Sequence, residues 1–392
     1  MSYSWPPAET VPDILSSEAP HVQPSFLVDE VMRRRREFGI SRVGSITRLD
    51  RVRIPVVQVV RPLALSNAVT QGKGMDHLQA TVSALMEALE LWAGEVPCSS
   101  RLDMTATELG SDVVDLYESA LTTQTPVDWR TTRLSWAQGW DLFRNEAIPV
   151  PLALVDTIYT IPSPHPPIFP RSTTGLGAGQ SLLQALCKAG LEILERDSVA
   201  KARNSYRFFE RWQVSPASVT EGKAAKLIAQ IEAASLLVGI WRVPAPHDLP
   251  IYWCHVMENR GFHELAPLPG SGYACHFTHG EALAGAMLEA CQGRLTAIAG
   301  AREDITREHY PMNHDRDQLA EWREFLAAPS SGIDVSELLT AGTGGCDQSL
   351  QRIIDALRRA GAKRAIAVPL YVDAASHIHV VRMVAPGMQQ AP

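Results

Sequence analysis

A first segment of the chain places a hydroxyl and two carboxylates at helical spacing. Ser83, Glu87 and Glu90 stand at i, i+4 and i+7, so they share one face of a helix. Leu85 and Leu89 fall on roughly the opposite face, which is the pattern of a helix packed on a core. The segment therefore predicts a helix that carries two neighbouring carboxylates.

A second segment repeats this combination within a more apolar stretch. Glu192 and Glu195 are three residues apart, and Arg196 and Asp197 follow directly. The turns before them are rich in leucine, so this helix is expected to be deeply buried.

A third segment carries an acid, an amide and a hydroxyl on one helical face. These residues are Glu289, Gln292 and Thr296, and Arg294 is adjacent. The surrounding residues are small and apolar, so close helix packing is expected here too.

Carboxylates in apolar surroundings need a partner, because an unpaired ion loses its hydration. Mg²⁺ meets this need, since it takes oxygen ligands and commonly bridges carboxylates to nucleotide phosphates. Arg196 and Arg294 would then pair with phosphate oxygens or with the acids. A single acidic pair on a helix is more often a solvated face, so spacing alone leaves both interpretations open.

Periodicity and turn residues predict the elements that position these side chains. Helices are expected at 28–38, 77–92, 182–202, 281–298 and 349–360, and strands at 54–61, 364–372 and 377–385. Residues 66–74 are expected to form a turn, and 327–347 a loop. The glycine cluster 175–179 is expected to form a turn with free backbone N–H groups that suit an anion. No internal repeat and no regular βαβ order is visible, so the predicted class is α/β (mixed α+β).

Composition limits the function classes. The 392 residues are 45% apolar and 20% charged, with 36 Lys and Arg against 43 Asp and Glu, and the net charge of −7 does not favour nucleic-acid binding. The six cysteines form no CxxC pair, which excludes zinc ribbons and thioredoxin-type sites. There is no signal peptide and no long apolar segment, so we expect a cytoplasmic protein without membrane or nucleic-acid partners.

Taken together and in order, several short segments resemble the YcaO family. The matching segments are 39–43, 47–55, 71–74, 83–90, 175–179, 191–197, 289–296, 300–304 and 380–387. The resemblance implies a YcaO-type fold over 38–388, with an N-terminal arm and short helix at 1–37 and a tail at 389–392. It also implies an ATP site formed by acidic helices, with Mg²⁺ as the metal.

The resemblance also implies roles for individual residues. Those expected around the metal are Glu87, Glu90, Glu192, Glu195 and Glu289. Those expected to contact nucleotide or phosphate in addition are Ser83, Gln180, Arg196, Gln292 and Arg294. The implied catalytic set is Glu192, Glu195, Arg196, Glu289 and Arg294.

The activity implied by the resemblance is ATP-dependent activation of a backbone amide in a precursor peptide or protein. The product is a thioamide, an azoline or an amidine, according to the nucleophile. Leu91 stands where the family usually has arginine after Glu90, no lysine precedes Lys73, and the Pro-x-Pro-x-Pro ending of azoline-forming members is absent. These departures favour a thioamide-forming member that works with a TfuA-like partner, with an azoline-forming cyclodehydratase as the alternative.

Partners and competing functions complete the expectations. The chain carries no fused E1-like or leader-binding domain, so a separate TfuA-like or E1-like protein is expected to deliver the substrate, and a homodimer is plausible for the family. A non-catalytic YcaO-like adaptor, which holds a peptide or partner without turning over ATP, is the alternative of another class. An unrelated ATP-dependent ligase would explain the acids but not the ordered segments.

Overall fold

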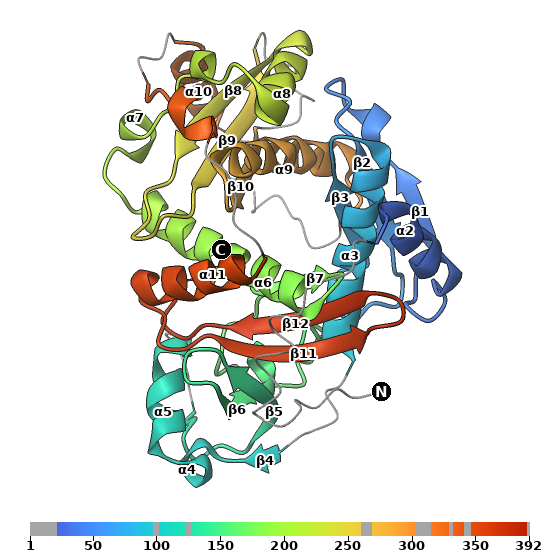
Figure 1. The fold of residues 1–392 in the computed structure, drawn as a ribbon, viewed down its shortest axis with the longest axis vertical. Helices are drawn as coiled ribbons and strands as arrows, with labels where there is room; N and C mark the ends of the chain where they lie inside the picture. Colours follow the sequence, from blue (N-terminus) through green and yellow to red (C-terminus); the bar gives the residue numbers. More distant parts are fainter. Residues whose placement is uncertain are drawn as a thin grey trace.

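The computed structural model describes residues 22–96, 102–122, 127–259, 269–302, 315–328, 332–340 and 346–389. Three sheets, in which every pairing of named strands is antiparallel, carry the helices of these ranges. Figure 1 shows a first sheet beside the N-terminal helices, a second in the lower half and a third near the opposite end. The predicted α/β (mixed α+β) class is confirmed, as is the lack of a regular βαβ order.

The first sheet has the strand order β1-β2-β3. Its elements are α2 (Pro24–Arg33), β1 (Arg42–Ser45), η1 (Thr47–Leu49), β2 (Val56–Val60), β3 (Val69–Lys73) and α3 (His77–Glu95). The predicted strand at 54–61 is β2 and the predicted helix at 77–92 is α3. The predicted helix at 28–38 begins earlier, with Pro24 at its first turn, and ends at Arg33.

The prediction of a turn over 66–74 is wrong for most of its length, because the chain forms β3 there. Gly72 lies in this edge strand, and a Cβ on it would stand 1.9 Å from the backbone nitrogen of Ala84. The glycine therefore permits a close approach of strand and helix rather than a turn.

The second sheet has the order β4-β5-β11-β12-β7, with β6 paired to β5. Its strands are β4 (Leu102–Met104), β5 (Leu134–Asp141), β6 (Glu146–Pro151), β7 (Leu176–Gly179), β11 (Ile366–Asp373) and β12 (Ile378–Val384). The accompanying helices are α4 (Ala106–Leu109), α5 (Ser111–Tyr117), η2 (Glu118–Ala120), η3 (Leu152–Leu154), α6 (Leu182–Arg203) and α11 (Cys346–Ala360). The predicted elements at 182–202, 349–360, 364–372 and 377–385 are confirmed as α6, α11, β11 and β12.

The third sheet has the order β10-β9-β8. Its strands are β8 (Leu236–Arg242), β9 (Ile251–Glu258) and β10 (Gly270–Cys275). Its helices are α7 (Phe208–Arg211), η4 (Pro216–Ser218), α8 (Gly222–Ala233), α9 (His279–Ala299), α10 (Arg316–Ala327) and η7 (Ser336–Thr340). The predicted helix at 281–298 is α9, which packs Ala282, Ala286 and Ala290 into the apolar core shared with α8 and this sheet.

One structural unit occurs three times, once on each sheet. An edge strand leads into a long helix, giving the pairs β3–α3, β7–α6 and β10–α9. The helices begin at Asp76, Ser181 and Thr278, and each side chain caps the helix by accepting a backbone hydrogen bond from the third helical residue. The expectation of no internal repeat is therefore wrong. The strands have 5, 4 and 6 residues and the helices 19, 22 and 21. The units share few residue identities, which hides them in the sequence.

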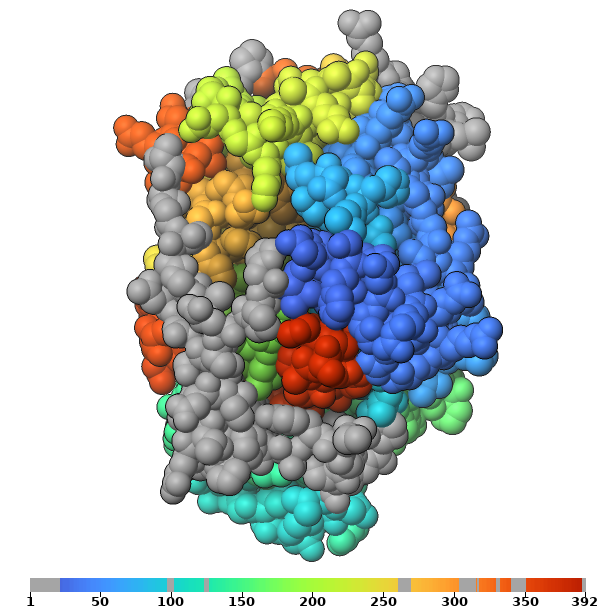
Figure 2. All heavy atoms as spheres, turned by 45° about the vertical axis from the view of Figure 1, so that its right-hand side comes forward, coloured from blue at the N-terminus to red at the C-terminus, as the bar shows by residue number. Residues whose placement is uncertain are grey.

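The N-terminal helix α2 and the chain after it pack on the β11–β12 hairpin. Figure 2 shows blue N-terminal residues against red residues of the C-terminal strands. The Arg34 guanidinium lies 2.7 Å from the Asp373 carboxylate and donates a hydrogen bond to the Tyr371 hydroxyl. Of the predicted arm, 1–21 lie outside the described residues. No helix in the described ranges has the length and apolarity that crossing a membrane requires.

Candidate active site

The candidate residues stand at equivalent positions of the three repeated helices. Counted from each N-cap residue, the positions 11 and 14 residues later carry a glutamate followed by a glutamate or glutamine. These pairs are Glu87 and Glu90 on α3, Glu192 and Glu195 on α6, and Glu289 and Gln292 on α9. Figure 1 shows the three helices arranged around one region of the molecule. We call the five glutamates the acidic cluster.

Two of the helices bind the edge strand of the next unit through a carboxylate. Glu90 of α3 accepts a hydrogen bond of 2.7 Å from the backbone N–H of Ala178 in β7. Glu195 of α6 accepts one of 3.2 Å from the backbone N–H of Cys275 in β10. Each carboxylate therefore pairs with a backbone N–H group of an edge strand, and this hydrogen bond fixes its position.

The third helix makes the corresponding contact with reversed polarity. The side-chain amide of Gln292 donates a hydrogen bond of 2.7 Å to the backbone carbonyl of Gln71 in β3. A carboxylate could not donate here, so the strand edge requires glutamine. Thr296, one turn later, donates to the side-chain oxygen of Gln71. The three contacts close a cycle from α3 to β7, α6 to β10 and α9 to β3.

The acids of α3 differ in their surroundings. Glu90 is buried, and the same oxygen that accepts from β7 also lies 2.6 Å from the ammonium of Lys188. Glu87 is half-buried, and burial, followed by the charge of Glu90, raises its pKa to about 7. Lys73 and Lys188 oppose this shift without cancelling it.

On α6, Glu195 is buried and Glu192 is half-buried, and neither has a firmly bound cation. Burial and then the charge of Glu289 raise the pKa of Glu195 to about 8, and burial raises that of Glu192 as well. The guanidinium of Arg196 lies 3.8 Å from Glu192 and 3.7 Å from Glu195, too far for hydrogen bonds. Its Nε is buried and has no hydrogen-bond partner among the described residues. Arg196 can therefore donate to an incoming anion.

On α9, the two predicted charged site residues, Glu289 and Arg294, interact with different partners. Glu289 lies 3.8 Å from the ammonium of Lys73 and contributes to the raised pKa of Glu195. Arg294 is buried, and its guanidinium pairs with Asp50 at 2.9 Å and with Glu258 at 2.6 Å. Its charge is thus neutralised by acids outside the acidic cluster.

The remaining predicted nucleotide contacts lie at the ends of the units. Gln180 follows β7, and its amide both donates to and accepts from the backbone of Val22, at 3.1 and 3.2 Å. Ser83 is half-buried on α3, one turn before Glu87. The structure thus brings the five glutamates and Arg196 together, whereas Gln180 binds the N-terminal segment.

The prediction that 175–179 form an anion-binding turn is wrong. Four of these residues form β7, which pairs with β12. The backbone N–H of Gly175 donates to Glu192 and that of Ala178 to Glu90, so these groups already have partners. The glycines serve packing, since a Cβ on Gly177 would stand 2.2 Å from the backbone oxygen of Ala185. The helix start itself is capped by Ser181.

The carboxylate oxygens of the acidic cluster fit a metal ion that binds together with a phosphate group. Among the described residues, no three His, Cys, Asp or Glu side chains are close enough to hold a metal ion by themselves. Glu87, Glu192 and Glu195 are nevertheless desolvated, and none forms a hydrogen bond to a cation. One or two carboxylates completed by phosphate and water oxygens are the usual environment of Mg²⁺.

Two cationic residues of this region were not among the predicted site residues. Lys188 lies four residues before Glu192 on α6, a spacing that puts the two side chains on one helical face. That spacing could have identified Lys188 from the sequence. Lys73 ends β3, and its approach to Glu289 depends on the contact between separate units, which no local pattern reveals.

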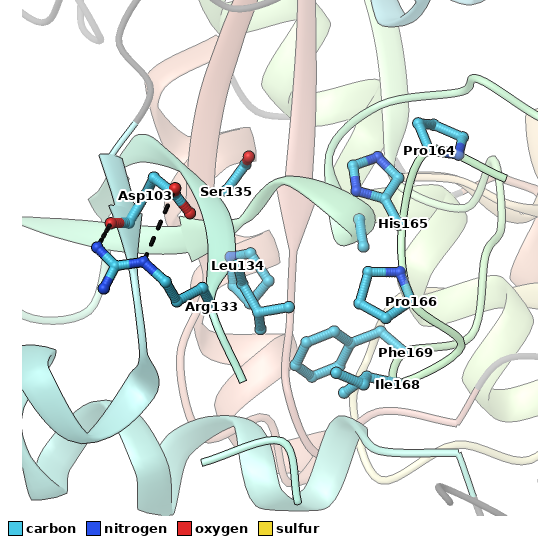
Figure 3. A pocket seen from close by; sticks show the side chains of 11 residues that line it. Asp103, Arg133, Leu134, Ser135, Pro164, His165, Pro166, Ile168 and Phe169 are labelled. Carbon is cyan, nitrogen blue, oxygen red and sulfur yellow. Dashed lines mark hydrogen bonds and ion pairs between the residues drawn. The ribbon is translucent and has the colours of Figure 1, made fainter. Parts of the chain in front are cut away.

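A separate cavity of about 100 Å³ lies beside β5 under the proline-rich segment that contains His165. Figure 3 shows that prolines, Leu134, Ile168 and Phe169 line it, and that Arg133 binds Asp103 at its edge. No member of the acidic cluster lines this cavity. It is therefore distinct from the candidate active site.

Comparisons with known proteins found relatives in sequence and in fold. A Mycobacterium tuberculosis protein is 33% identical over 275 residues, which are 69% of this chain and 60% of that protein, so the chain spans about three-fifths of that relative. A protein in the tfuA 3′ region of Rhizobium leguminosarum bv. trifolii is 27% identical over 362 residues, covering 90% of this chain and 84% of the relative. The structure of YcaO from Methanopyrus kandleri, bound with AMPPCP and Mg²⁺, matches with a TM-score of 0.69 at 22% identity, covering 94% of this chain and 91% of that one.

The match to a family model covers most of the chain. The model describes the YcaO cyclodehydratase family as ATP- and Mg²⁺-binding, and it matches residues 71–389. This range contains all three acidic helices and every predicted site residue. The expected cofactors, ATP and Mg²⁺, are those of the family. The chain is a member of the YcaO family.

Proposed function

We propose that the protein uses ATP to activate a backbone amide of a peptide or protein, and that the product is a thioamide. The observation that carries this proposal is the acidic cluster, in which a strand edge fixes the Glu195 carboxylate while neither it nor the Glu192 carboxylate has a cation within hydrogen-bond distance. In the reaction, hydrosulfide adds to the amide carbon and the amide oxygen takes the terminal phosphoryl group of ATP. That oxygen then leaves as phosphate, giving a thioamide and ADP.

The residues of this chain have separate tasks in the proposal. The acidic cluster holds Mg²⁺, which offsets negative charge on the phosphates when bound. Arg196 donates its uncommitted Nε–H to a phosphate oxygen, and this charge-assisted bond orients the transferring group. Ser83, Gln180 and Gln292 are the proposed nucleotide contacts. The partners of Arg294 give it a positioning role, because they tie α9 to Asp50 and Glu258.

The relative from the tfuA 3′ region supports a TfuA-like partner, which the family resemblance links to a thioamide product. The family description supports an azoline-forming cyclodehydratase as the alternative. Mass spectrometry of a precursor peptide incubated with the protein, Mg·ATP, sulfide and the partner separates the two. Exchange of oxygen for sulfur raises the peptide mass, whereas azoline formation lowers it by one water.

A non-catalytic adaptor that binds a peptide or partner is the second candidate, and Leu91 in place of arginine is the observation that favours it. Leu91 is buried, and its backbone carbonyl accepts a hydrogen bond from Thr157, so this position offers no charge. An adaptor would bind the peptide without releasing phosphate from ATP.

In the catalytic proposal, the catalytic domain spans 38–388, acts in the cytoplasm and receives its substrate from a separate protein.

Calorimetric titration of Mg·ATP tests the proposed site. Wild-type protein should bind in a magnesium-dependent manner, and Glu192→Gln and Glu289→Gln should each weaken binding at least roughly tenfold, because each removes a charge-assisted contact. Glu281→Gln is the matched control, since Glu281 lies on α9 but pairs with Lys223 at the surface. Folded wild-type protein that binds no nucleotide, even with a TfuA-like partner present, would contradict the catalytic proposal.

A further inference from the structure

Among the described residues, each junction between two of the acidic helices contains at least one cationic side chain. Lys188 lies between α3 and α6, Arg196 between α6 and α9, and Lys73 between α9 and α3. These cations do not occupy equivalent positions of the three units, unlike the glutamates. The cluster thus combines repeated acids with individually placed cations, so the three cations can have different tasks.

Lys188 is held firmly by the acids of two helices. Its side chain is 50% exposed, but its ammonium lies 2.6 Å from Glu90. Partial loss of solvent around the ammonium lowers its pKa, and the charges of Glu90, Glu87 and Glu192 outweigh this effect and raise it. The same oxygen of Glu90 accepts from Lys188 and from β7. The second oxygen of Glu90 has no hydrogen bond among the described residues, so Lys188 fixes the carboxylate while leaving one oxygen for a ligand.

Lys73 is held only loosely. Its ammonium lies 3.8 Å from Glu289, beyond hydrogen-bond distance, and its side chain is 28% exposed. No hydrogen bond to this ammonium occurs within the described ranges, so all three of its donors are available. Its charge also lowers the pKa of Glu87, which places it between two half-buried acids.

We infer that Lys73 binds a phosphate of the nucleotide, whereas Lys188 positions Glu90. The inference rests on the proposed function. If Glu87 or Glu289 held Mg²⁺, the phosphates of the nucleotide would come close to these acids, and Lys73 is a loosely held cation beside both. Lys188 brings a positive charge to Glu90 from the neighbouring helix. Lys188 thereby supplies the positive charge beside Glu90 that the uncharged Leu91 does not supply.

The test compares Lys73→Met and Lys188→Met by calorimetry with ATP, ADP and AMP, each with and without Mg²⁺. Lys73→Met should weaken ATP and ADP binding about tenfold or more and change AMP binding less than about twofold, because AMP lacks the outer phosphates. Lys188→Met should raise the Mg²⁺ concentration needed for half-saturation about tenfold and leave magnesium-free binding unchanged. Lys188→Arg should restore the wild-type magnesium dependence, since it keeps the charge.

Lys201→Met is the matched control, because Lys201 also pairs with a buried acid of α6, Asp197, at 2.6 Å. It should change neither the magnesium dependence nor the preference for ATP. Thermal unfolding of each variant shows whether it is folded, and Lys73→Arg separates loss of charge from loss of packing. Nucleotide binding by wild-type protein with unchanged values in both methionine variants would overturn this inference alone. No nucleotide binding by wild-type protein would overturn the proposed function and this inference together.

Discussion

Glu95 and Glu195 are equally buried glutamates with opposite surroundings. Their exposed fractions are 8% and 9%, and each lies in the second half of a long helix. Glu95 accepts hydrogen bonds from two nitrogens of Arg61 and from the backbone and hydroxyl of Ser66. Glu195 accepts one backbone hydrogen bond and has its nearest cation at 3.7 Å. Burial alone therefore does not distinguish a structural acid from an acid that can bind a ligand. The number of hydrogen-bond donors that each carboxylate already has distinguishes them.

This difference gives the two acids opposite effects on stability. Removing the charge of Glu95 leaves the buried guanidinium of Arg61 without its counter-ion. Glu195 has a pKa of about 8, above the usual value, so the folded protein holds its proton more tightly than the unfolded chain does. The stabilisation from that proton is present at acidic pH and is lost as the pH rises through about 8.

The largest effect should follow Glu95→Gln. We expect it to lower the free energy of unfolding by about 3–5 kcal/mol, because Arg61 becomes an uncompensated buried charge. Urea unfolding at neutral pH measures the change. A loss within about 0.5 kcal/mol of wild type would show that the Arg61–Glu95 pair does not carry the assigned structural role.

Glu195→Gln should have the opposite effect in alkaline solution. We expect the ligand-free variant to be more stable than wild type by about 1–3 kcal/mol at pH 9 and close to wild type at pH 5. The amide removes a carboxylate that must ionise in a buried site, and it can still accept from Cys275. Urea unfolding at both pH values measures this. Equal destabilisation at both values would place Glu195 in the same class as Glu95.

The smallest effect should come from an exposed ion pair that joins α8 to α9, the helix of Glu289. Lys223 and Glu281 lie 2.8 Å apart, with 52% and 44% of their side chains exposed. Lys223→Met should change the free energy of unfolding by less than about 1 kcal/mol and leave Mg·ATP binding unchanged, because solvent screens the pair. A larger change in either quantity would show that distance rather than burial decides what these pairs contribute.

The sequence predicts the acidic helices well because helical periodicity is local. The helices expected at 77–92, 182–202 and 281–298 are α3, α6 and α9, and all five predicted metal-site glutamates lie on them. Glycine-containing edge strands were missed, since β7 depends on pairing with the distant β12, and both β3 and β7 depend on close contact with a helix. The acids that neutralise Arg294 lie far from it in the chain, so spacing could not reveal them.

The repeated unit was missed for a related reason. Strand, cap and helix recur in the same order and at similar lengths, but the residues of β7 and β10 did not distinguish these strands from turns and short irregular segments. Once the caps at Asp76, Ser181 and Thr278 are aligned, Glu87, Glu192 and Glu289 fall at the same position of the three helices. Matching helix caps before comparing residues would have found the repeat in the sequence.

If the acidic cluster binds Mg·ATP as proposed, binding should displace protons held by Glu87 and Glu195. Calorimetric titration of Mg·ATP at pH 7.5, in two buffers of different ionisation enthalpy, counts the protons released on binding. With pKa values of about 7 for Glu87 and about 8 for Glu195, the account predicts release of about one proton at pH 7.5 and almost none at pH 9.5. Tight binding with no proton release at pH 7.5 would contradict it.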